Sequence, residues 1–348
     1  MTEISKTIRL HIQNPPTPET APPGYPVRKM NPAFVISKRW FDEASARNPD
    51  VALRLEPTFG ETPEEFHAAM KDAEVLIATT QVLKERFPLP MPAPCLRWVM
   101  VTSASYHKLL PIDWLPDGVV LVHNLGPHAK KAGEFIATAL LMLNCRIPYF
   151  ITAKEEKRWA PLVTSGIEGK TLAVIGVGKL GGAGAERARN LGLRVLGIRR
   201  SGDAHPLCDE TYGPDGLERV LPHADFVLVT LPFTAEAEGY FDRRAFAMMK
   251  EGAGFITTAP TRVFDYEALV ESLGSGRLSG AVLDGFDPEP VPQDSLLWTT
   301  PNLIMTPHTS CIDAEDYTPK TLDLLFENLR AELAGKPLTT CANIERGY

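Results

Sequence analysis

The sequence lacks several features that would each assign it to a particular class of protein. It has no excess of basic residues, because 43 acidic residues outnumber 36 lysines and arginines and leave a net charge of −7. It has no apolar run near the roughly 18 residues that a membrane-spanning helix requires, and its N-terminus has no apolar signal-peptide core. We therefore expect a cytoplasmic protein that binds neither nucleic acid nor a membrane.

Cysteine is scarce. The chain of 348 residues contains five cysteines, an odd number, and no C-x-x-C pair. A disulfide framework or a structural zinc site would require paired cysteines at characteristic spacings. We therefore expect reduced thiols and no metal site.

The chain does contain strand-like apolar runs that alternate with helical patterns, which is typical of parallel sheets covered by helices. Early strands are expected at 8–12, 51–55, 74–79, 96–102 and 119–123, and helices at 33–47, 63–72 and 131–144. A second block begins at Thr171 with strands at 171–177, 193–199, 226–232, 254–259, 280–286 and 303–307. These six strands in about 135 residues fit one doubly wound nucleotide-binding domain.

Prolines are concentrated in one segment near the N-terminus. Seven of them lie between Pro15 and Pro32. Proline fixes φ and lacks a backbone donor, so the segment is predicted to be a surface loop. A lid over an active site is the alternative interpretation.

The strongest local motif is a glycine-rich turn between a strand and a helix. Gly176, Gly178 and Gly181 have the G-x-G-x-x-G spacing of a dinucleotide site. The first permits a tight turn, the second lets the backbone approach a pyrophosphate, and the third lets the helix pack closely on the strand. The helix that begins near Lys179 and Leu180 offers free N–H groups to the phosphates.

The end of the second strand of this block indicates which dinucleotide binds. NAD sites normally place Asp or Glu there, on the ribose hydroxyls, whereas this chain has Arg199, Arg200 and Ser201. Guanidinium and hydroxyl groups bind a 2′-phosphate that a carboxylate would repel. The sequence therefore favours NADP(H) over NAD(H). The alternative is a solvated pair of arginines beside an unselective site.

From about Leu96 to Ser310 the sequence resembles the D-isomer-specific 2-hydroxyacid dehydrogenases, which include the glyoxylate/hydroxypyruvate reductases. The glycine motif and the stretch GRLSGAVLDGFDPEPVPQDSLLWTTPNLIMTPH, residues 276–308, carry this resemblance. It implies an α/β fold with two Rossmann-like domains, each a parallel sheet flanked by helices. The substrate domain would comprise residues 1–125 and 309–348, with the dinucleotide-binding domain, residues 126–308, inserted in it. Members usually form homodimers through the nucleotide domain.

The resemblance also implies roles for individual residues. His308, in Thr-Pro-His, matches the catalytic general acid/base, and Glu289 matches the carboxylate that orients and charges it. A surface role for Glu289 is the alternative. Asp284 matches the residue that holds the nicotinamide carboxamide. The positions that line the adenosine and nicotinamide-ribose regions are Leu231, Pro232 and Thr258.

Two positions depart from the family pattern, and both concern the substrate. The family arginine that binds the substrate carboxylate is replaced by Pro260, and Arg262 is the nearest candidate to substitute for it. A glycine-rich substrate loop is replaced by residues 103–107, whose backbone N–H groups could still bind an anion. The candidate substrate contacts in this loop are Ser103, Ser105, Tyr106 and His107.

Three functional hypotheses follow. The first is an NADPH-dependent oxidoreductase that transfers hydride to a small 2-keto acid or a related ketone or aldehyde through a His–Glu proton relay. The second is a non-catalytic sensor of NADP(H), which the missing arginine favours. The third is an enzyme that uses a bound dinucleotide without net redox change. The retained His308 and Glu289 favour the first.

Overall fold

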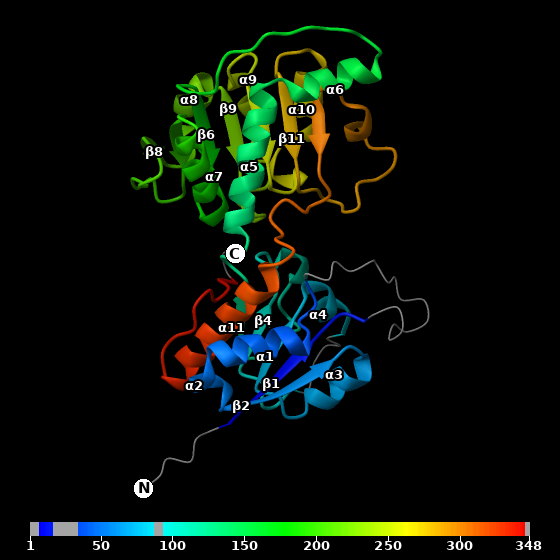
Figure 1. Cartoon of the computed structure of the whole chain (residues 1–348), viewed down its shortest axis with the longest axis vertical. Coiled ribbons are helices and arrows are strands. Elements are labelled where there is room, and N and C mark those ends of the chain that lie inside the picture. Colours follow the sequence, from blue (N-terminus) through cyan, green and yellow to red (C-terminus); the bar gives the residue numbers. More distant parts are fainter. Residues whose placement is uncertain (1–6, 17–33, 87–92, 345–348) are drawn as a thin grey trace. The chain divides into compact units, whose positions relative to one another are not determined.

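The computed structural model describes residues 7–16, 34–86 and 93–344 (Figure 1). The chain divides into two compact units, and each is considered by itself. Unit 1 comprises Met1–Pro127 and Asp313–Tyr348, and unit 2 comprises His128–Ile312. Unit 2 is thus an insertion between the two segments of unit 1.

Unit 1 contains a five-stranded parallel sheet with the order β2-β1-β3-β4-β5. Its strands are β1 Ile8–Gln13, β2 Leu55–Gly60, β3 Val75–Ala78, β4 Trp98–Val101 and β5 Val120–His123. Its helices are α1 Lys38–Arg47, α2 Pro49–Ala52, α3 Pro63–Ala69, α4 Thr80–Arg86, η2 His107–Leu109 and α11 Tyr317–Leu333. Successive strand residues point to opposite faces, so Trp98 packs toward α1 and α11 while Val99 packs toward α3.

Unit 2 contains a seven-stranded sheet with the order β12-β11-β10-β9-β6-β7-β8, all parallel. Its strands are β6 Thr171–Ile175, β7 Arg194–Ile198, β8 Glu210–Tyr212, β9 Phe226–Val229, β10 Gly254–Thr257, β11 Gly280–Leu283 and β12 Leu303–Met305. Its α-helices are α5 Ala129–Asn144, α6 Ile147–Glu155, α7 Lys179–Asn190, α8 Leu217–Val220, α9 Arg243–Met248 and α10 Tyr266–Gly274. Its 3₁₀ helices are η3 Pro214–Gly216, η4 Leu221–His223, η5 Thr261–Val263 and η6 Leu296–Thr299.

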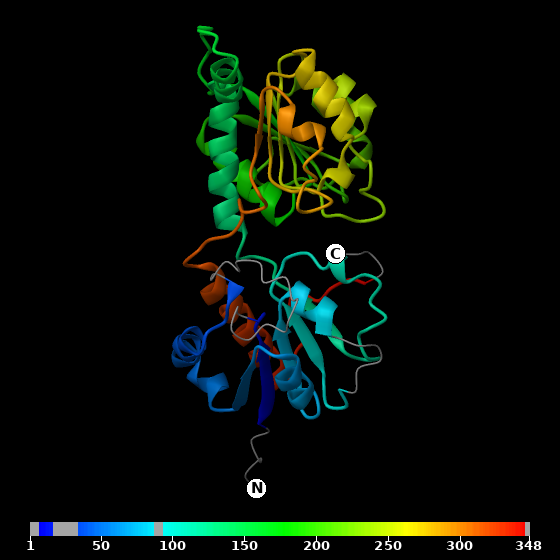
Figure 2. The same ribbon diagram turned by 90° about the vertical axis from the view of Figure 1, so that its right-hand side faces the viewer.

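Helices cover both faces of the unit 2 sheet, as Figure 2 shows with α5 on one side and the yellow α10 on the other. The central strands β6, β9, β10 and β11 are buried on both faces, which explains their continuous apolar sequences. Strand order reverses between β6 and β9, and such a switch point leaves a crevice at the carboxyl ends of the strands. The fold therefore directs the loops after β6, β7, β9, β10 and β11 to the edge where doubly wound sheets bind ligands.

Some expected elements differ from the structure. The strand expected at 51–55 is wrong, because Pro49 starts the short helix α2 and β2 begins only at Leu55. The helix expected from 33 begins at Lys38, since the Ser37 side chain accepts from Trp40 N and caps it. Strand β8 was not expected, because its three partly exposed residues at the sheet edge carry no apolar run.

Much of the proline-rich segment, 17–33, lies outside the described residues. Its flanks are joined by Asn14, whose side-chain amide donates to Ile36 O (3.1 Å) and accepts from Ile36 N (2.9 Å). The loop and lid interpretations of the segment stay predictions. Among the described residues no single helix is long and apolar enough to cross a membrane; only the bent pair of α5 and α6 passes that test.

The contact between β6 and α7 depends on Gly181. A Cβ on this residue would lie 2.2 Å from Gly176 O and 2.7 Å from Thr230 Oγ1. The neighbouring Gly182 is different, because a Cβ there would meet no atom closer than 3.9 Å. The helix can therefore approach the strand only with glycine at 181.

We predict that Gly181→Ala lowers the free energy of unfolding by at least about 2 kcal/mol, because the methyl group would overlap rigid backbone. Gly182→Ala is the matched control, and it should raise stability by up to about 1 kcal/mol through helix propensity. Urea unfolding of both variants measures the difference. Equal stability of the two variants would show that the close approach at 181 is unimportant.

Candidate active site

The glycine loop after β6 forms the first part of the site. Gly176 has φ +100°, a value that favours glycine, and Gly178 is the N-cap of α7. A Cβ on Gly178 would meet no atom within 4 Å, so open space adjoins the start of the helix. The first N–H groups of α7, at Lys179 and Leu180, lack intrahelical acceptors by geometry. Open space beside these donors fits a pyrophosphate group.

The two arginines at the end of β7 have different surroundings. Arg200 donates to Glu236 Oε2 at 2.8 Å, whereas no carboxylate of the described residues forms an ion pair with Arg199. Burial and, secondarily, the charge of Arg199 lower the pKa of His205. Ser201 Oγ accepts from Asp203 N at 3.3 Å. Arg199 is therefore the better placed of the two arginines to meet an anionic ligand.

The loop after β9 borders the glycine loop, and the loop after β10 lies one strand further along the sheet. Leu231 packs against Gly176, whose Cβ would lie 3.0 Å from Leu231 Cδ2, and Pro232 beside it is exposed. Thr230 Oγ1 donates to Gly176 O at 2.7 Å and so fixes the turn. Thr258 Oγ1 is buried and has no hydrogen-bond partner among the described residues. A buried unsatisfied hydroxyl at a ligand-binding edge is consistent with a group that a cofactor completes.

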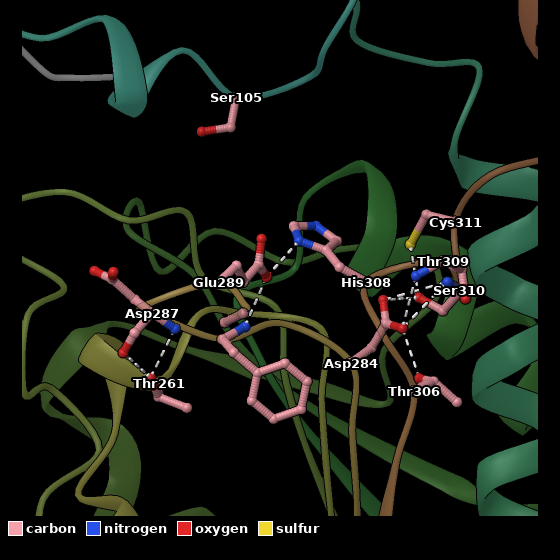
Figure 3. A network of polar contacts seen from close by, with 12 residues as sticks. Ser105, Thr261, Asp284, Asp287, Glu289, Thr306, His308, Thr309, Ser310 and Cys311 are labelled. Atoms are coloured by element: carbon pink, nitrogen blue, oxygen red, sulfur yellow. Dashed lines mark hydrogen bonds and ion pairs between the residues drawn. The ribbon is translucent and has the colours of Figure 1, made fainter. Parts of the chain in front are cut away.

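Asp284, after β11, is buried and accepts from donors in the segment that contains His308. Its Oδ1 accepts from Thr306 Oγ1 (2.6 Å), Thr309 N (3.1 Å) and Ser310 N (3.2 Å), and its Oδ2 accepts from Ser310 Oγ (Figure 3). His308 itself has φ +54°, a strained value for a residue with a side chain. Asp284 therefore holds the turn that presents His308, a role that sequence reasoning missed.

His308 and Glu289 are in direct contact. His308 Nδ1 donates to Glu289 Oε1 at 2.7 Å, and the same oxygen accepts from Phe286 N at 3.0 Å (Figure 3). The His308 side chain is 57% exposed and that of Glu289 19%. Because a carboxylate only accepts, Nδ1 carries the hydrogen in this contact, and Nε2 is the ring nitrogen that Glu289 does not engage. This arrangement suits a general acid/base with a carboxylate partner.

Arg262, the candidate replacement for the family arginine, is bound elsewhere. Its Nη2 donates to Glu238 Oε1 at 2.7 Å, and its Nη1 lies 3.6 Å from Asp287 Oδ2. The guanidinium carbon lies 4.8 Å from the ring centroid of Phe233. Hydrogen bonding to Glu238 raises the pKa of Arg262. The guanidinium is thus committed to two carboxylates, and the idea that it reaches back to bind a substrate carboxylate is not supported.

The loop at 103–107 belongs to unit 1, whereas His308 belongs to unit 2. Ser103 Oγ contacts Thr80 Oγ1 and donates to Ser105 O at 2.8 Å. Ser105 Oγ, which is exposed, lies 2.6 Å from His107 Nδ1. Ser105 and His107 stay candidate substrate contacts, and so does Ser103.

The prediction that the Tyr106 side chain contacts the substrate is wrong. It is 1% exposed, and its hydroxyl donates to Asn343 O at 2.9 Å. The side chain therefore fills the core of unit 1 instead of facing a ligand. Burial of an aromatic ring between the polar residues Ser105 and His107 gave no signal in the sequence.

Thiol and metal chemistry have little basis in the described part of the chain. All five cysteines are free thiols, and no group of three or more His, Cys, Asp or Glu side chains there could hold a metal ion. Burial raises the pKa of the Cys311 thiol to about 11, so this thiol beside Ser310 stays protonated. The acid/base chemistry of the site therefore depends on the imidazole and carboxylate groups.

Comparison with known proteins gives consistent results. Residues 137–310 match the NAD-binding domain of D-isomer-specific 2-hydroxyacid dehydrogenases. The chain is 30% identical over 275 residues to a glyoxylate reductase from Korarchaeum cryptofilum, covering 76% of this chain and 80% of that protein. It is 28% identical over 332 residues to glyoxylate/hydroxypyruvate reductase B from Escherichia fergusonii, covering 90% and 98% of the two chains.

A solved structure agrees with these relatives. A D-isomer-specific 2-hydroxyacid dehydrogenase from Xanthobacter autotrophicus, in complex with NADPH and MES, superposes with a TM-score of 0.76 at 25% identity. The match covers 99% of this chain and all of the other. The glycine loop and the open space beside Gly178 fit the dinucleotide that such proteins bind. The chain belongs to the D-isomer-specific 2-hydroxyacid dehydrogenase family and is an NAD(P)-dependent oxidoreductase acting on CH–OH groups.

Proposed function

We propose that the protein is an NADPH-dependent reductase that transfers hydride to the carbonyl carbon of a small 2-keto acid or a related ketone or aldehyde. The observation that carries this proposal is the 2.7 Å contact between His308 Nδ1 and Glu289 Oε1. The relatives named glyoxylate and glyoxylate/hydroxypyruvate reductases support the choice of a small keto acid.

The bound dinucleotide would supply the hydride, held by the N–H groups at the start of α7 and by the loops after β7, β9 and β10. His308 donates a proton from Nε2 to the carbonyl oxygen and takes it back in the reverse direction. Glu289 stabilises the imidazolium form and fixes the ring orientation through Nδ1. Asp284 keeps His308 in its left-handed backbone conformation through Thr309 and Ser310.

The preference for NADP(H) rests on the end of β7. Arg199 has no carboxylate partner among the described residues, and Ser201 adds a hydroxyl two positions on. A guanidinium whose charge is not compensated binds a phosphate more strongly than one already paired. We therefore assign the main contact with the 2′-phosphate to Arg199 and a smaller one to Arg200.

The assembly we propose is a homodimer through unit 2. Exposed apolar side chains recur from the end of α5 through α6 and the segment that follows, and we infer that they form one surface; Trp159 and Val163 are each 96% exposed. The other members of this surface are Leu141, Ile147, Ile151 and Leu162. Large exposed apolar surfaces on soluble proteins usually mark interaction sites. A second copy of the chain would bury these side chains.

One observation favours the NADP(H) sensor as a second candidate. The resemblance to the family places Pro260 where other members have an arginine, and Arg262 is already bound to Glu238 and Asp287. Without a guanidinium, a keto acid loses bidentate binding of its carboxylate. Tight NADPH binding with no turnover over a panel of keto acids, ketones and aldehydes would favour the sensor.

We predict that His308→Gln lowers kcat by at least about 10²-fold while the Kd for NADPH stays nearly constant, because the proton donor is lost and the cofactor contacts are kept. Glu289→Gln should reduce activity less at low pH than at high pH, since the neutral amide no longer stabilises the imidazolium form. The decrease in NADPH absorbance measures kcat, and fluorescence titration measures the Kd for NADPH. Full activity of His308→Gln would refute the assignment.

We predict that Arg199→Leu raises the Kd for NADPH by about tenfold, the equivalent of one lost charge-assisted bond, and leaves the Kd for NADH unchanged. Arg200→Leu is the control, and its effect should be smaller because Arg200 is paired with Glu236. Calorimetric titration with NADPH and with NADH gives the ratio of the two Kd values for each variant. Equal affinity of the wild-type protein for the two coenzymes would contradict the proposed preference.

We predict that Trp159→Glu combined with Val163→Asp converts a dimer into monomers, because the charged side chains would be buried at the interface. Leu53→Glu is the control, since Leu53 is 88% exposed and lies in unit 1. Sedimentation velocity distinguishes the two species. An unchanged sedimentation coefficient of the double variant would place the interface elsewhere.

A further inference from the structure

The segment 260–262 lacks the arginine expected from the family pattern, but its side chains make several contacts with a neighbouring loop. It follows β10 and enters the 3₁₀ helix η5. Both Thr261 and Arg262 contact Asp287, which lies in the loop between β11 and η6.

Thr261 makes the stronger connection. Its side-chain hydroxyl accepts from Asp287 N at 3.0 Å and donates to Asp287 O at 2.9 Å (Figure 3). A hydroxyl can fill both roles at once because it has one hydrogen and two lone pairs. Thr261 is 8% exposed, so water cannot readily replace these bonds. One side chain therefore satisfies both backbone polar groups of a residue two positions before Glu289.

Arg262 adds a second connection to the same loop. Its Nη1 lies 3.6 Å from Asp287 Oδ2, while Glu238 and the ring of Phe233 hold the guanidinium on the other side. About half of the Arg262 side chain is exposed, at 49%, so solvent screens this ion pair. We expect Arg262 to contribute less than Thr261.

The loop that these residues hold carries the carboxylate partner of His308. Phe286 N donates to Glu289 Oε1, and Thr261 fixes Asp287 between them. Glu289 has to remain within hydrogen-bond distance of His308 Nδ1 to stabilise the imidazolium. A displacement of the loop would break a contact of 2.7 Å without removing either partner.

We propose that Thr261, assisted by Arg262, is a positioning residue that acts on His308 through the loop 286–289 and the Glu289 carboxylate. In this chain the segment 260–262 therefore helps to position the partner of the proton donor His308 and does not bind the substrate carboxylate. The role of the segment in catalysis rests on the proposed function of His308. Its effect on the titration of the imidazole does not, because that can be observed without turnover.

The test compares variants of Thr261 that share its shape but differ in hydrogen bonding. Thr261→Val keeps the volume and removes the hydroxyl, which leaves both backbone groups of Asp287 unsatisfied. Thr261→Ser restores the hydroxyl. Arg262→Gln removes the ion pair with Asp287 together with the contacts to Glu238 and Phe233. Arg244→Gln is the control, since it removes an exposed ion pair with Glu218 elsewhere in unit 2.

The main readout is the NMR titration of the His308 ring in full-length protein with labelled histidine, and the pH profile of kcat is the second. Glu289→Gln defines the complete loss of the carboxylate. We expect Thr261→Val to move the titration midpoint of His308 to lower pH by at least half of the Glu289→Gln effect. Thr261→Ser and Arg244→Gln should titrate as wild type, and Arg262→Gln should lie between.

For catalysis we expect Thr261→Val to lower kcat by roughly tenfold on the high-pH side, because less of the imidazole is protonated there. The KM for NADPH should not change. A folded Thr261→Val variant with a wild-type His308 midpoint would overturn the proposal. If Thr261→Val does not fold, an unchanged midpoint in Arg262→Gln would overturn it instead. A shifted midpoint in a protein without reductase activity would refute the proposed function and keep the positioning role.

Discussion

The contact between His308 and Glu289 is the interaction on which the proposed proton transfer depends. An imidazole that donates one N–H to a fixed carboxylate presents its other nitrogen in one tautomer and one orientation. Both partners lie on loops, which are less rigid than strands, so each loop needs its own support. Asp284 supports the turn of His308, and Thr261 supports the loop of Glu289.

The sheet of unit 2 explains why cofactor and acid/base groups meet at one edge. Its seven strands are parallel, so the loops after successive strands emerge on the same side. The glycine loop follows β6, Arg199 follows β7, Thr258 follows β10, and Asp284 follows β11. Each loop contributes its group independently, so a replacement in one of them, such as the one expected at Pro260, leaves the groups on the other loops in place.

Sequence reasoning succeeded where a local pattern depends on neighbours in the chain, and it failed where burial decides. Strands β6, β9 and β10 are continuous apolar runs because helices cover both their faces. The short edge strand β8 has partly exposed residues and no such run. A strand was expected at 51–55, but Pro49 starts the helix α2 there. The inward position of Tyr106 depends on its contact with Asn343, 237 residues away.

The sequence by itself indicated the alternation of an α/β fold and the glycine loop through local pattern and spacing. Its resemblance to the family implied the pair formed by His308 and Glu289. Only the tertiary structure decided how the charged groups are used. It paired Arg200 with Glu236, left Arg199 without a carboxylate among the described residues, and turned Arg262 toward Glu238. The physical reason is that an ion pair is selected by proximity in space, and these partners are 24 to 36 positions apart in the chain.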